Sequence, residues 1–204
     1  EMPDMYDHGH YDMAGFAVGI ADADDLLKPE SLKKGDVLLG LASNGLHSNG
    51  FSLVRDILFK QNDYQLSDRL PGCELDIAHE LLRPTKIYVK SVLPLVEKKL
   101  IQGIAHITGG GLIENVARIL PAGLSAEFHL NSWQIPAVMT DLQSIGHLSL
   151  ADMENTFNLG LGMVLAVRQE DAAKVKSALE NAGETVYQVG QLIAGDKKVI
   201  IRED

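Results

Sequence analysis

The sequence has little cysteine, few aromatic residues and no long apolar run, and these shortages exclude several classes of protein. Its one cysteine, Cys73, cannot form a disulfide within the chain, which excludes a small disulfide-stabilised secreted domain. A membrane-spanning helix takes about 20 apolar residues, and even residues 158–167 form only a short stretch broken by glycine. We therefore expect a protein of the reducing cytoplasm that does not bind a membrane.

Basic residues are also scarce. The chain has 18 Lys and Arg against 28 Asp and Glu, a formal net charge of -10, and no cluster of basic side chains. Such a surface repels polyanions, so nucleic acid is not an expected partner. A small phosphate can still bind, because backbone N–H groups at turns and helix N-termini attract anions locally.

Length and composition fit one globular domain. The 204 residues, 46% of them hydrophobic, can bury a single large core. The chain starts at Glu1 rather than methionine and shows no leader-like segment, so we expect a piece of a longer intracellular protein. The polar, turn-prone residues 1–12 are interpreted as an interdomain segment and residues 13–204 as one substrate- and phosphate-binding domain.

The apolar pattern predicts alternating strands and helices without an internal repeat or linker. Strands are expected at residues 14–21, 36–41, 104–107, 124–130, 159–167, 186–193 and 197–201. Helices are expected after residues 50, 85, 111, 136 and 170, the first capped by Ser48 or Asn49 and the second by Thr85. The predicted fold class is α+β, with a single mixed β-sheet and helices packed on it.

Two polar loops, residues 43–49 and residues 106–111, each follow a predicted strand and precede a predicted helix. Three glycines after Thr108 let backbone N–H groups turn towards one point, which suits a phosphate, although an ordinary glycine-rich turn is the alternative. Neither G-x-x-x-x-G-K-[ST] nor G-x-G-x-x-G occurs, which excludes a P-loop and a dinucleotide-binding βαβ unit.

The chemistry-bearing candidates lie in these two loops. His47 and His106 are predicted to be catalytic, because each can donate a hydrogen bond or move a proton near neutral pH. Taken singly, either histidine could be a structural hydrogen-bonding residue. The predicted substrate- and phosphate-binding residues are Ser43, Asn44, Ser48, Asn49, Thr108, Gly109, Gly110 and Gly111.

No metal site is predicted. His8 and His10 lie between Asp7 and Asp12, so two imidazoles and two carboxylates are available near the start of the chain. The stretch lacks the rigid helical spacing that holds metal ligands together. Cys73 has no lysine or histidine beside it in the sequence, which argues against a nucleophilic thiolate.

Seven segments, taken together and in order, resemble aminoimidazole ribonucleotide synthetase, the phosphoribosylformylglycinamidine cyclo-ligase family of purine biosynthesis. They are residues 1–3, 11–16, 35–38, 44–55, 83–90, 105–111 and 157–160. The most specific are His-Ser-Asn-Gly at residues 47–50 and His-Ile-Thr-Gly-Gly-Gly at residues 106–111. The chain departs from the family pattern chiefly at His8 and His10.

The resemblance covers the C-terminal half of that family's protein. It implies that ATP and Mg²⁺ are bound mainly by the N-terminal half, which also forms the family's homodimer, so this chain alone is expected to be a monomer without catalytic activity. The implied reaction is phosphorylation of the formamide oxygen of phosphoribosylformylglycinamidine by ATP, attack by the amidine nitrogen and loss of phosphate. His47 and Asn49 would then face the reacting amide, residues 108–111 a phosphate, and His106 the transferring group.

Two alternatives remain from the sequence. A relative in the same superfamily, the formylglycinamide ribonucleotide amidotransferase or a small-molecule kinase, would keep both loops and change the substrate. Residues 83–90, Arg-Pro-Thr-Lys-Ile-Tyr-Val-Lys, favour the cyclo-ligase over these relatives. The other alternative is a non-catalytic binding module that uses the fold without the chemistry.

Overall fold

A mixed six-stranded sheet organises the computed structural model, which describes residues 9, 11 and 13–203. The strands are β1 (Val37–Ala42), β2 (Ile101–His106), β3 (Leu124–His129), β4 (Leu161–Val167), β5 (Val186–Ala194) and β6 (Val199–Arg202). Their order is β2-β4-β1-β5-β3-β6, and all neighbours are antiparallel except β3 and β6. The predicted fold class, α+β with a single mixed sheet, is confirmed.

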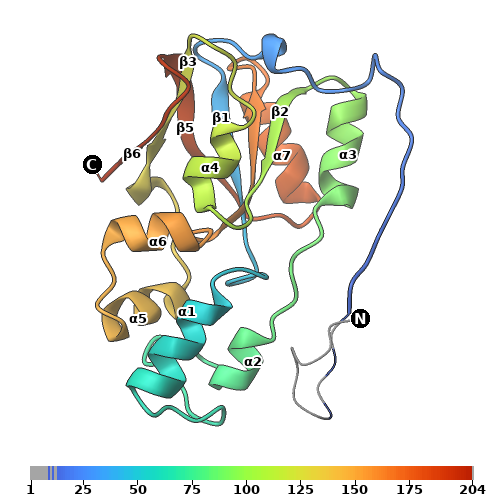
Figure 1. Cartoon of the computed structure of the whole chain (residues 1–204). Coiled ribbons are helices and arrows are strands. Elements are labelled where there is room, and N and C mark those ends of the chain that lie inside the picture. Colours follow the sequence, from blue (N-terminus) through green and yellow to red (C-terminus); the bar gives the residue numbers. More distant parts are fainter. Residues whose placement is uncertain (1–8, 10, 12, 204) are drawn as a thin grey trace.

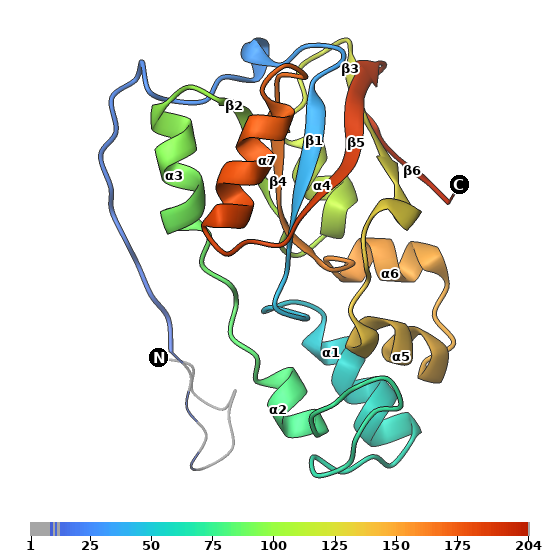
Figure 2. The same ribbon diagram turned by 180° about the vertical axis from the view of Figure 1, so that it is seen from behind.

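The helices are distributed over both faces and one end of the sheet. They are α1 (Phe51–Arg55), α2 (Ile77–Leu81), α3 (Val89–Glu97), α4 (Gly111–Ala117), α5 (Ala137–Ile145), α6 (Leu150–Thr156) and α7 (Ala172–Asn181). A π-helical segment, Asp56–Gln61, continues α1. Helices α3 and α7 lie on one face and α4 on the other, while α1, α2, α5 and α6 extend beyond one end of the sheet (Figures 1 and 2).

Strand β1 contributes to two hydrophobic cores. Because side chains alternate along a strand, Val37, Leu39 and Leu41 pack under α3 and α7, whereas Leu38 packs in the larger core on the opposite side. Each of these residues is almost wholly buried. The continuous apolar run that predicted a buried strand here therefore reflects a central position with helices on both faces.

The strand predicted at residues 14–21 is wrong. These residues have no regular secondary structure, and Phe16 is 94% exposed and Ile20 fully exposed. A strand is stabilised by pairing with a neighbour, and within the described chain no strand lies beside this segment. Part of the β2 edge is covered instead by the short 3-10 turn Pro29–Ser31, where the Ser31 hydroxyl donates to the Gln102 carbonyl at 3.0 Å.

The predicted helix caps are also wrong. Gly50 directly precedes α1 and Tyr88 directly precedes α3, each without a side-chain cap. The hydroxyls of Ser48 and Thr85 instead lie 2.9 Å apart and bridge two loops. The short helices α2 and α6 were not predicted, because their five and seven residues give little apolar periodicity. The start of α6 nevertheless has a signal in the sequence, the capping box of Ser149 and Asp152.

A half-buried ion pair joins the start of β1 to the end of β4. Asp36 precedes β1 and is nearly fully buried, and Arg168 follows β4. Nη1 of Arg168 lies 2.7 Å from both carboxylate oxygens of Asp36, and Nη2 donates to the Ser31 carbonyl at 2.6 Å. One guanidinium thereby ties two central strands to the turn that covers the β2 edge.

Replacing Arg168 with Met should lower the free energy of unfolding by about 3 kcal/mol, because it leaves the Asp36 carboxylate buried and unpaired. Urea unfolding measures the change. The control is Lys176→Met, which removes an exposed pair with Glu180 at 3.9 Å and should cost less than about 0.5 kcal/mol. Equal losses in the two variants would show that the Arg168 pair has no special structural role.

Candidate functional site

The sheet topology brings the two predicted loops together. Strands β1 and β2 are both antiparallel to β4, which lies between them, so their C-terminal ends meet at one edge of the sheet. Residues 43–50 follow β1 and residues 107–110 follow β2. Oδ1 of Asn49 lies 3.5 Å from the position that a Cβ on Gly109 would take, so the loops are in contact.

A buried asparagine holds the first loop. Asn158 is only 2% exposed and comes from the turn that leads into β4. Its Nδ2 donates to the Gly45 carbonyl at 3.0 Å, and its Oδ1 accepts from the Ser43 hydroxyl at 3.1 Å and from the Gly160 N–H at 2.8 Å. The side chain of Asn158 thus fixes the start of the loop against β4.

A second buried asparagine holds the other loop. Nδ2 of Asn115, on α4, lies within 3.3 Å of the carbonyl oxygens of Thr108, Gly109 and Gly111, and its Oδ1 accepts from the Thr108 hydroxyl at 3.1 Å. The carbonyls therefore face the interior. Within the described chain the N–H groups of Gly109 and Gly110 have no hydrogen-bond partner, which leaves them available to an anion.

His47 has a fixed hydrogen-bonding arrangement. The ring is 5% exposed, and its Nε2 accepts from the Asn44 N–H at 2.9 Å and, more weakly, from the Lys86 N–H at 3.4 Å. An acceptor at Nε2 requires the neutral ring to carry its proton on Nδ1. That Nδ1 is buried and has no partner among the described residues. His47 thus offers an unsatisfied N–H donor.

Burial keeps this ring neutral. Desolvation, helped by the nearby His106 and the Lys86 ammonium, lowers the pKa of His47 from 6.5 to about 4. The position of the His47 ring also requires glycine at residue 162 of β4. A Cβ there would lie 2.6 Å from Cε1 of His47 and would clash with the Tyr88 hydroxyl. A bare glycine in β4 therefore makes room for both rings.

Beside His47 lies a small buried polar cluster. Nζ of Lys86 is 2.6 Å from Oε2 of Glu184, and Oε1 of Glu184 accepts from the Ser91 hydroxyl at 2.7 Å. Tyr88 donates to the Ala42 carbonyl at 2.9 Å, and burial raises the pKa of its phenol. The cluster connects residues 84–91 to β1 and to the start of β5.

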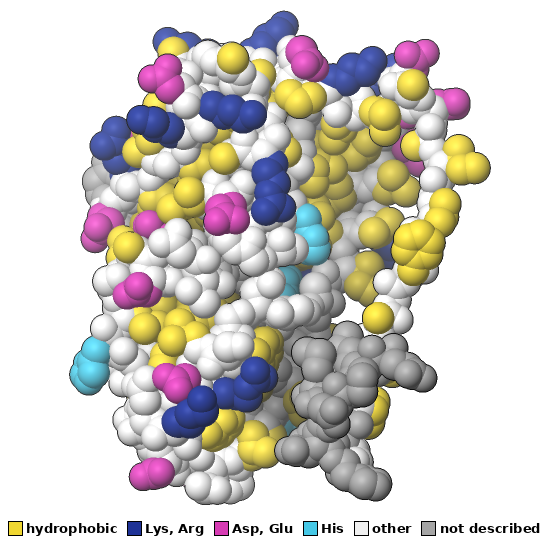
Figure 3. All heavy atoms as spheres, viewed as in Figure 1, with side chains coloured by type: hydrophobic (Ala, Val, Ile, Leu, Met, Phe, Trp, Pro, Cys, Tyr) yellow, Lys and Arg dark blue, Asp and Glu magenta, His cyan; other side chains and the backbone are white. Residues whose placement is uncertain are grey.

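His106 lies at the rim of an apolar groove. The ring is exposed at the end of β2. The groove, of about 440 Å³, runs between α3 and β2 and is lined by Tyr88, Val92, Val96, Ile104 and Met163 among others. Histidine side chains are visible beside an apolar hollow near the centre of Figure 3. The two predicted catalytic histidines therefore differ: one is buried and neutral, and the other is open to a ligand.

Several predicted binding residues use their side chains within the loops. Ser43 bonds to Asn158, Asn44 donates to the Pro84 carbonyl at 3.1 Å, and Thr108 bonds to Asn115. Their binding role stays a prediction, and in this structure they support the loops. The side chains of Ser48, Asn49 and His106 and the backbone of Gly109 and Gly110 face outwards or are only partly buried.

Sequence reasoning missed the residues that hold the site, namely Asn115, Asn158, Lys86 and Glu184. A usable signal existed for Asn158, since it is flanked by Phe157 and Leu159, which are themselves buried. A polar amide in such a position must find hydrogen-bond partners. No local pattern indicated Lys86 and Glu184, which are 98 residues apart.

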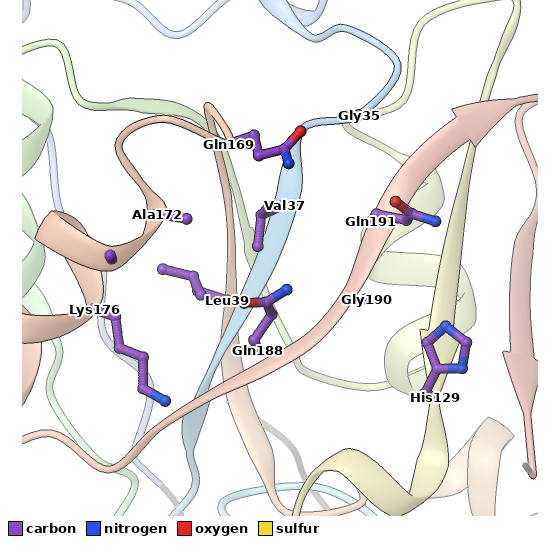
Figure 4. Close-up of a pocket in the computed structure, with 11 residues that line it drawn as sticks. Gly35, Val37, Leu39, His129, Gln169, Ala172, Lys176, Gln188, Gly190 and Gln191 are labelled. Carbon is purple, nitrogen blue, oxygen red and sulfur yellow. The ribbon is translucent and has the colours of Figure 1, made fainter.

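Other features of the described chain contribute nothing to this site. A second hollow of about 510 Å³, over β5 and beside α7, is lined by glutamines, Lys176 and His129 and contains none of the predicted residues (Figure 4). Among the described residues no three His, Cys, Asp or Glu side chains converge as metal ligands. Most of the residue 7–12 stretch considered for a metal lies outside the described residues. In the described chain, helices are too short or too polar to cross a bilayer.

The lowered pKa of His47 predicts a pH dependence of stability. Between about pH 4 and 6.5 the unfolded chain binds a proton that folded His47 does not, so the free energy of unfolding should rise with pH by up to about 3 kcal/mol across this window. His47→Asn should remove that rise, as measured by urea unfolding at both ends of the window. The control is His147→Asn, because His147 is exposed and shares the positive φ of His47 (51° against 57°). An unchanged slope in His47→Asn would contradict the assignment.

Comparison with known sequences identifies the family of the chain. Residues 33–203 match the family described as "AIR synthase related protein, C-terminal domain". The chain is 52% identical over 195 residues to a phosphoribosylformylglycinamidine cyclo-ligase of Lactobacillus delbrueckii subsp. bulgaricus, covering 94% of this chain and 55% of that protein. A Bacillus cereus protein of the same name is 49% identical over 195 residues, covering 96% of this chain and 56% of that protein. The chain thus spans about half the length of these relatives.

Solved structures show that the fold is shared more widely. A thiamine-monophosphate kinase from Stenotrophomonas maltophilia superposes with a TM-score of 0.58 at 16% identity, covering 87% of this chain and 53% of that one. The hydrogenase maturation protein HypE of E. coli gives a TM-score of 0.55 at 15% identity, covering 86% of this chain and 48% of that one. At such low identity these likenesses concern the fold alone. From the match over residues 33–203, the chain belongs to the family of AIR synthase related proteins and contains that family's C-terminal domain.

Proposed function

We propose that the chain is the C-terminal part of a phosphoribosylformylglycinamidine cyclo-ligase. The observation that carries this proposal is the contact of the two loops, one with His47 and the other with His106 and the unbonded N–H groups of Gly109 and Gly110, in a chain about half identical to proteins of that name. The structural likeness to a kinase concerns the fold alone and favours no second function.

The proposed reaction is an ATP-driven ring closure. The formamide oxygen of phosphoribosylformylglycinamidine attacks the γ-phosphorus of ATP, and ADP leaves. The amidine nitrogen then attacks the activated carbon, the C–O bond breaks, and inorganic phosphate departs as the ring forms. Phosphorylation converts a poor leaving group into a good one, so the protein contributes mainly positioning and charge stabilisation.

The site residues suit these roles. The Nδ1–H of His47, buried and without a partner, can donate to an oxygen of the reacting amide next to Asn49. The free N–H groups of Gly109 and Gly110 can bind a phosphate of the substrate or the nucleotide. His106, exposed at the groove rim, is placed to stabilise the group in transfer.

One side chain opposes anion binding at the second loop. The Glu114 carboxylate packs against Gly110, at the place where an added Cβ would lie. Its partner, Arg118, is 3.8 Å away and both side chains are exposed, so the pair is weak. Helix α4 has only seven residues, and its dipole adds little. Phosphate binding therefore requires Glu114 to rotate away and depends on the loop backbone itself.

The described residues contain no group of three or more His, Cys, Asp or Glu side chains that could hold a metal ion by itself. We infer that Mg²⁺ and most ATP contacts belong to the part of the relatives that this chain does not span. The division into an interdomain segment at residues 1–12 and a domain at residues 13–204, the homodimer of the whole enzyme and its cytoplasmic location are parts of the same proposal.

A chimera tests the function. Exchanging the matching 195 residues of the Bacillus cereus relative for this chain should give a protein that forms aminoimidazole ribonucleotide from its substrate and ATP. His106→Ala should lower kcat more than it raises KM, since charge develops only during transfer. His147→Asn is the control and should leave both constants unchanged. A folded chimera that releases ADP without forming the ring would indicate a kinase instead.

The second loop provides another prediction. Titrating the 204-residue chain with inorganic phosphate should shift the amide NMR signals of Gly109 and Gly110. Gly110→Val should abolish the shift, because φ is 87° there and a β-branched side chain resists that conformation.

Two further variants complete the test. Gly123→Val is the matched control, since Gly123 also has a positive φ (84°) but no atom near its Cβ position. Glu114→Gln should strengthen phosphate binding severalfold by removing a like charge. Undiminished binding by Gly110→Val would show that the glycines serve only the turn.

A further inference from the structure

Glu184 and Lys86 form a buried charged pair to which the proposed reaction assigns no role. Their side chains are 6% and 30% exposed, and Nζ of Lys86 lies 2.6 Å from Oε2 of Glu184 at an angle outside hydrogen-bond geometry. Burying a carboxylate is costly unless it is paired. The hydroxyl of Ser91 supplies a further hydrogen bond at 2.7 Å. A buried ion pair often adds little to the stability of a protein. We therefore ask what the position of this pair does for the site.

The pair attaches the backbone around Lys86 to the rest of the protein. Residues 84–87 have no helix or ladder hydrogen bonds of their own, whereas the Tyr88 carbonyl accepts from the Val92 N–H at 3.0 Å in the first turn of α3. Two contacts of the segment 84–88, Pro84 with Asn44 and Thr85 with Ser48, are made with the loop of residues 43–49 itself. These contacts cannot fix the segment independently of that loop. The segment is attached to the rest of the protein by the Lys86–Glu184 pair and, at its end, by Tyr88, which is buried, donates its hydroxyl to β1 and accepts at its carbonyl from α3. Glu184 therefore fixes Lys86 from outside the loop.

We propose that Glu184 and Lys86 are positioning residues for His47. The ion pair holds the Lys86 N–H against Nε2 of His47, alongside the Asn44 N–H. With two donors at Nε2, the ring is restricted to the neutral tautomer that carries its proton on Nδ1. His47 then acts on the substrate as a hydrogen-bond donor and does not accept a proton, which leaves any proton movement to other groups.

Packing alone does not account for this restriction. Gly162 and Tyr88 shape the space around the His47 ring. The centroids of the His47 and Tyr88 rings are 6.4 Å apart. Contacts of that kind fix where the ring lies, but they do not distinguish a proton on Nδ1 from one on Nε2. Only hydrogen-bond donors at Nε2 make that distinction. Weakening the Lys86–Glu184 pair should therefore change the tautomer of His47 while the protein still folds.

The direct test is ¹⁵N NMR of the histidine rings in the 204-residue chain, with His47 identified by its loss in His47→Asn. The wild-type ring should show the Nδ1–H tautomer alone between about pH 5 and 8. Glu184→Gln keeps the shape and the acceptor for Ser91 but removes the charge that holds Lys86. In that variant the ring should become a mixture of tautomers and should begin to titrate within this range.

Matched variants separate positioning from general stability. Glu180→Gln removes an exposed carboxylate on α7 and should leave the His47 signals unchanged. Lys86→Arg, which keeps a cation beside Glu184, should keep the single tautomer, and Lys86→Met should lose it. If Glu184→Gln fails to fold, Ser91→Ala, which weakens the hold on Glu184, should give a smaller shift in the same direction. A folded Glu184→Gln protein with an unchanged tautomer would overturn the proposal.

The kinetic consequence rests on the proposed function. In the cyclo-ligase chimera, Glu184→Gln should lower kcat on the order of tenfold to a hundredfold with little change in KM, because a misplaced donor loses transition-state contact. Lys86→Arg, with Glu184 unchanged, should keep most of the wild-type kcat, and Lys86→Met should lower it as Glu184→Gln does. If the chimera is inactive while the tautomer responds as expected, the proposed function fails and the positioning role stands. If the chimera is active and Glu184→Gln keeps full kcat, the positioning role fails.

Discussion

The antiparallel pairing of β4 with both β1 and β2 is the constraint on which the rest of the site depends. With β4 between them, β1 and β2, which are far apart in sequence, run in the same direction and finish at the same end of the sheet. Their following loops then have to share one edge, and the turn that enters β4 lies between them. Neither loop could form the site alone, because the contact of Asn49 with Gly109 exists only in this strand order.

Two buried amides hold the loops at this edge in place. Asn115 and Asn158 each satisfy several backbone groups from one rigid side chain, which a carboxylate or an ammonium could do only at a greater desolvation cost. Since the amide of Asn115 binds carbonyl oxygens, the opposite side of its loop presents N–H groups. We propose that a protein with a net charge of -10 can bind an anion at these N–H groups.

The sequence allowed the elements and the two loops to be predicted, but not the way in which they are held. Apolar runs such as Val37–Ala42 identify central strands, and glycine next to histidine identified the loops. The caps proposed at Ser48 and Thr85 failed because those hydroxyls bond across loops, a contact set by tertiary structure. Residues 14–21 failed for a related reason: apolar composition indicates that a segment prefers burial but does not supply a neighbour. The Lys86–Glu184 pair joins distant positions and leaves no local pattern.

Gly162 has a consequence for comparing relatives of this chain. The site depends there on the absence of an atom, since one added methyl group would displace two aromatic rings at once. A homologue could therefore retain every polar residue of both loops and still have lost the arrangement. The residue at position 162 of β4 would distinguish such homologues from those that keep the arrangement. A search restricted to the histidines, asparagines and glycine loops would not distinguish them.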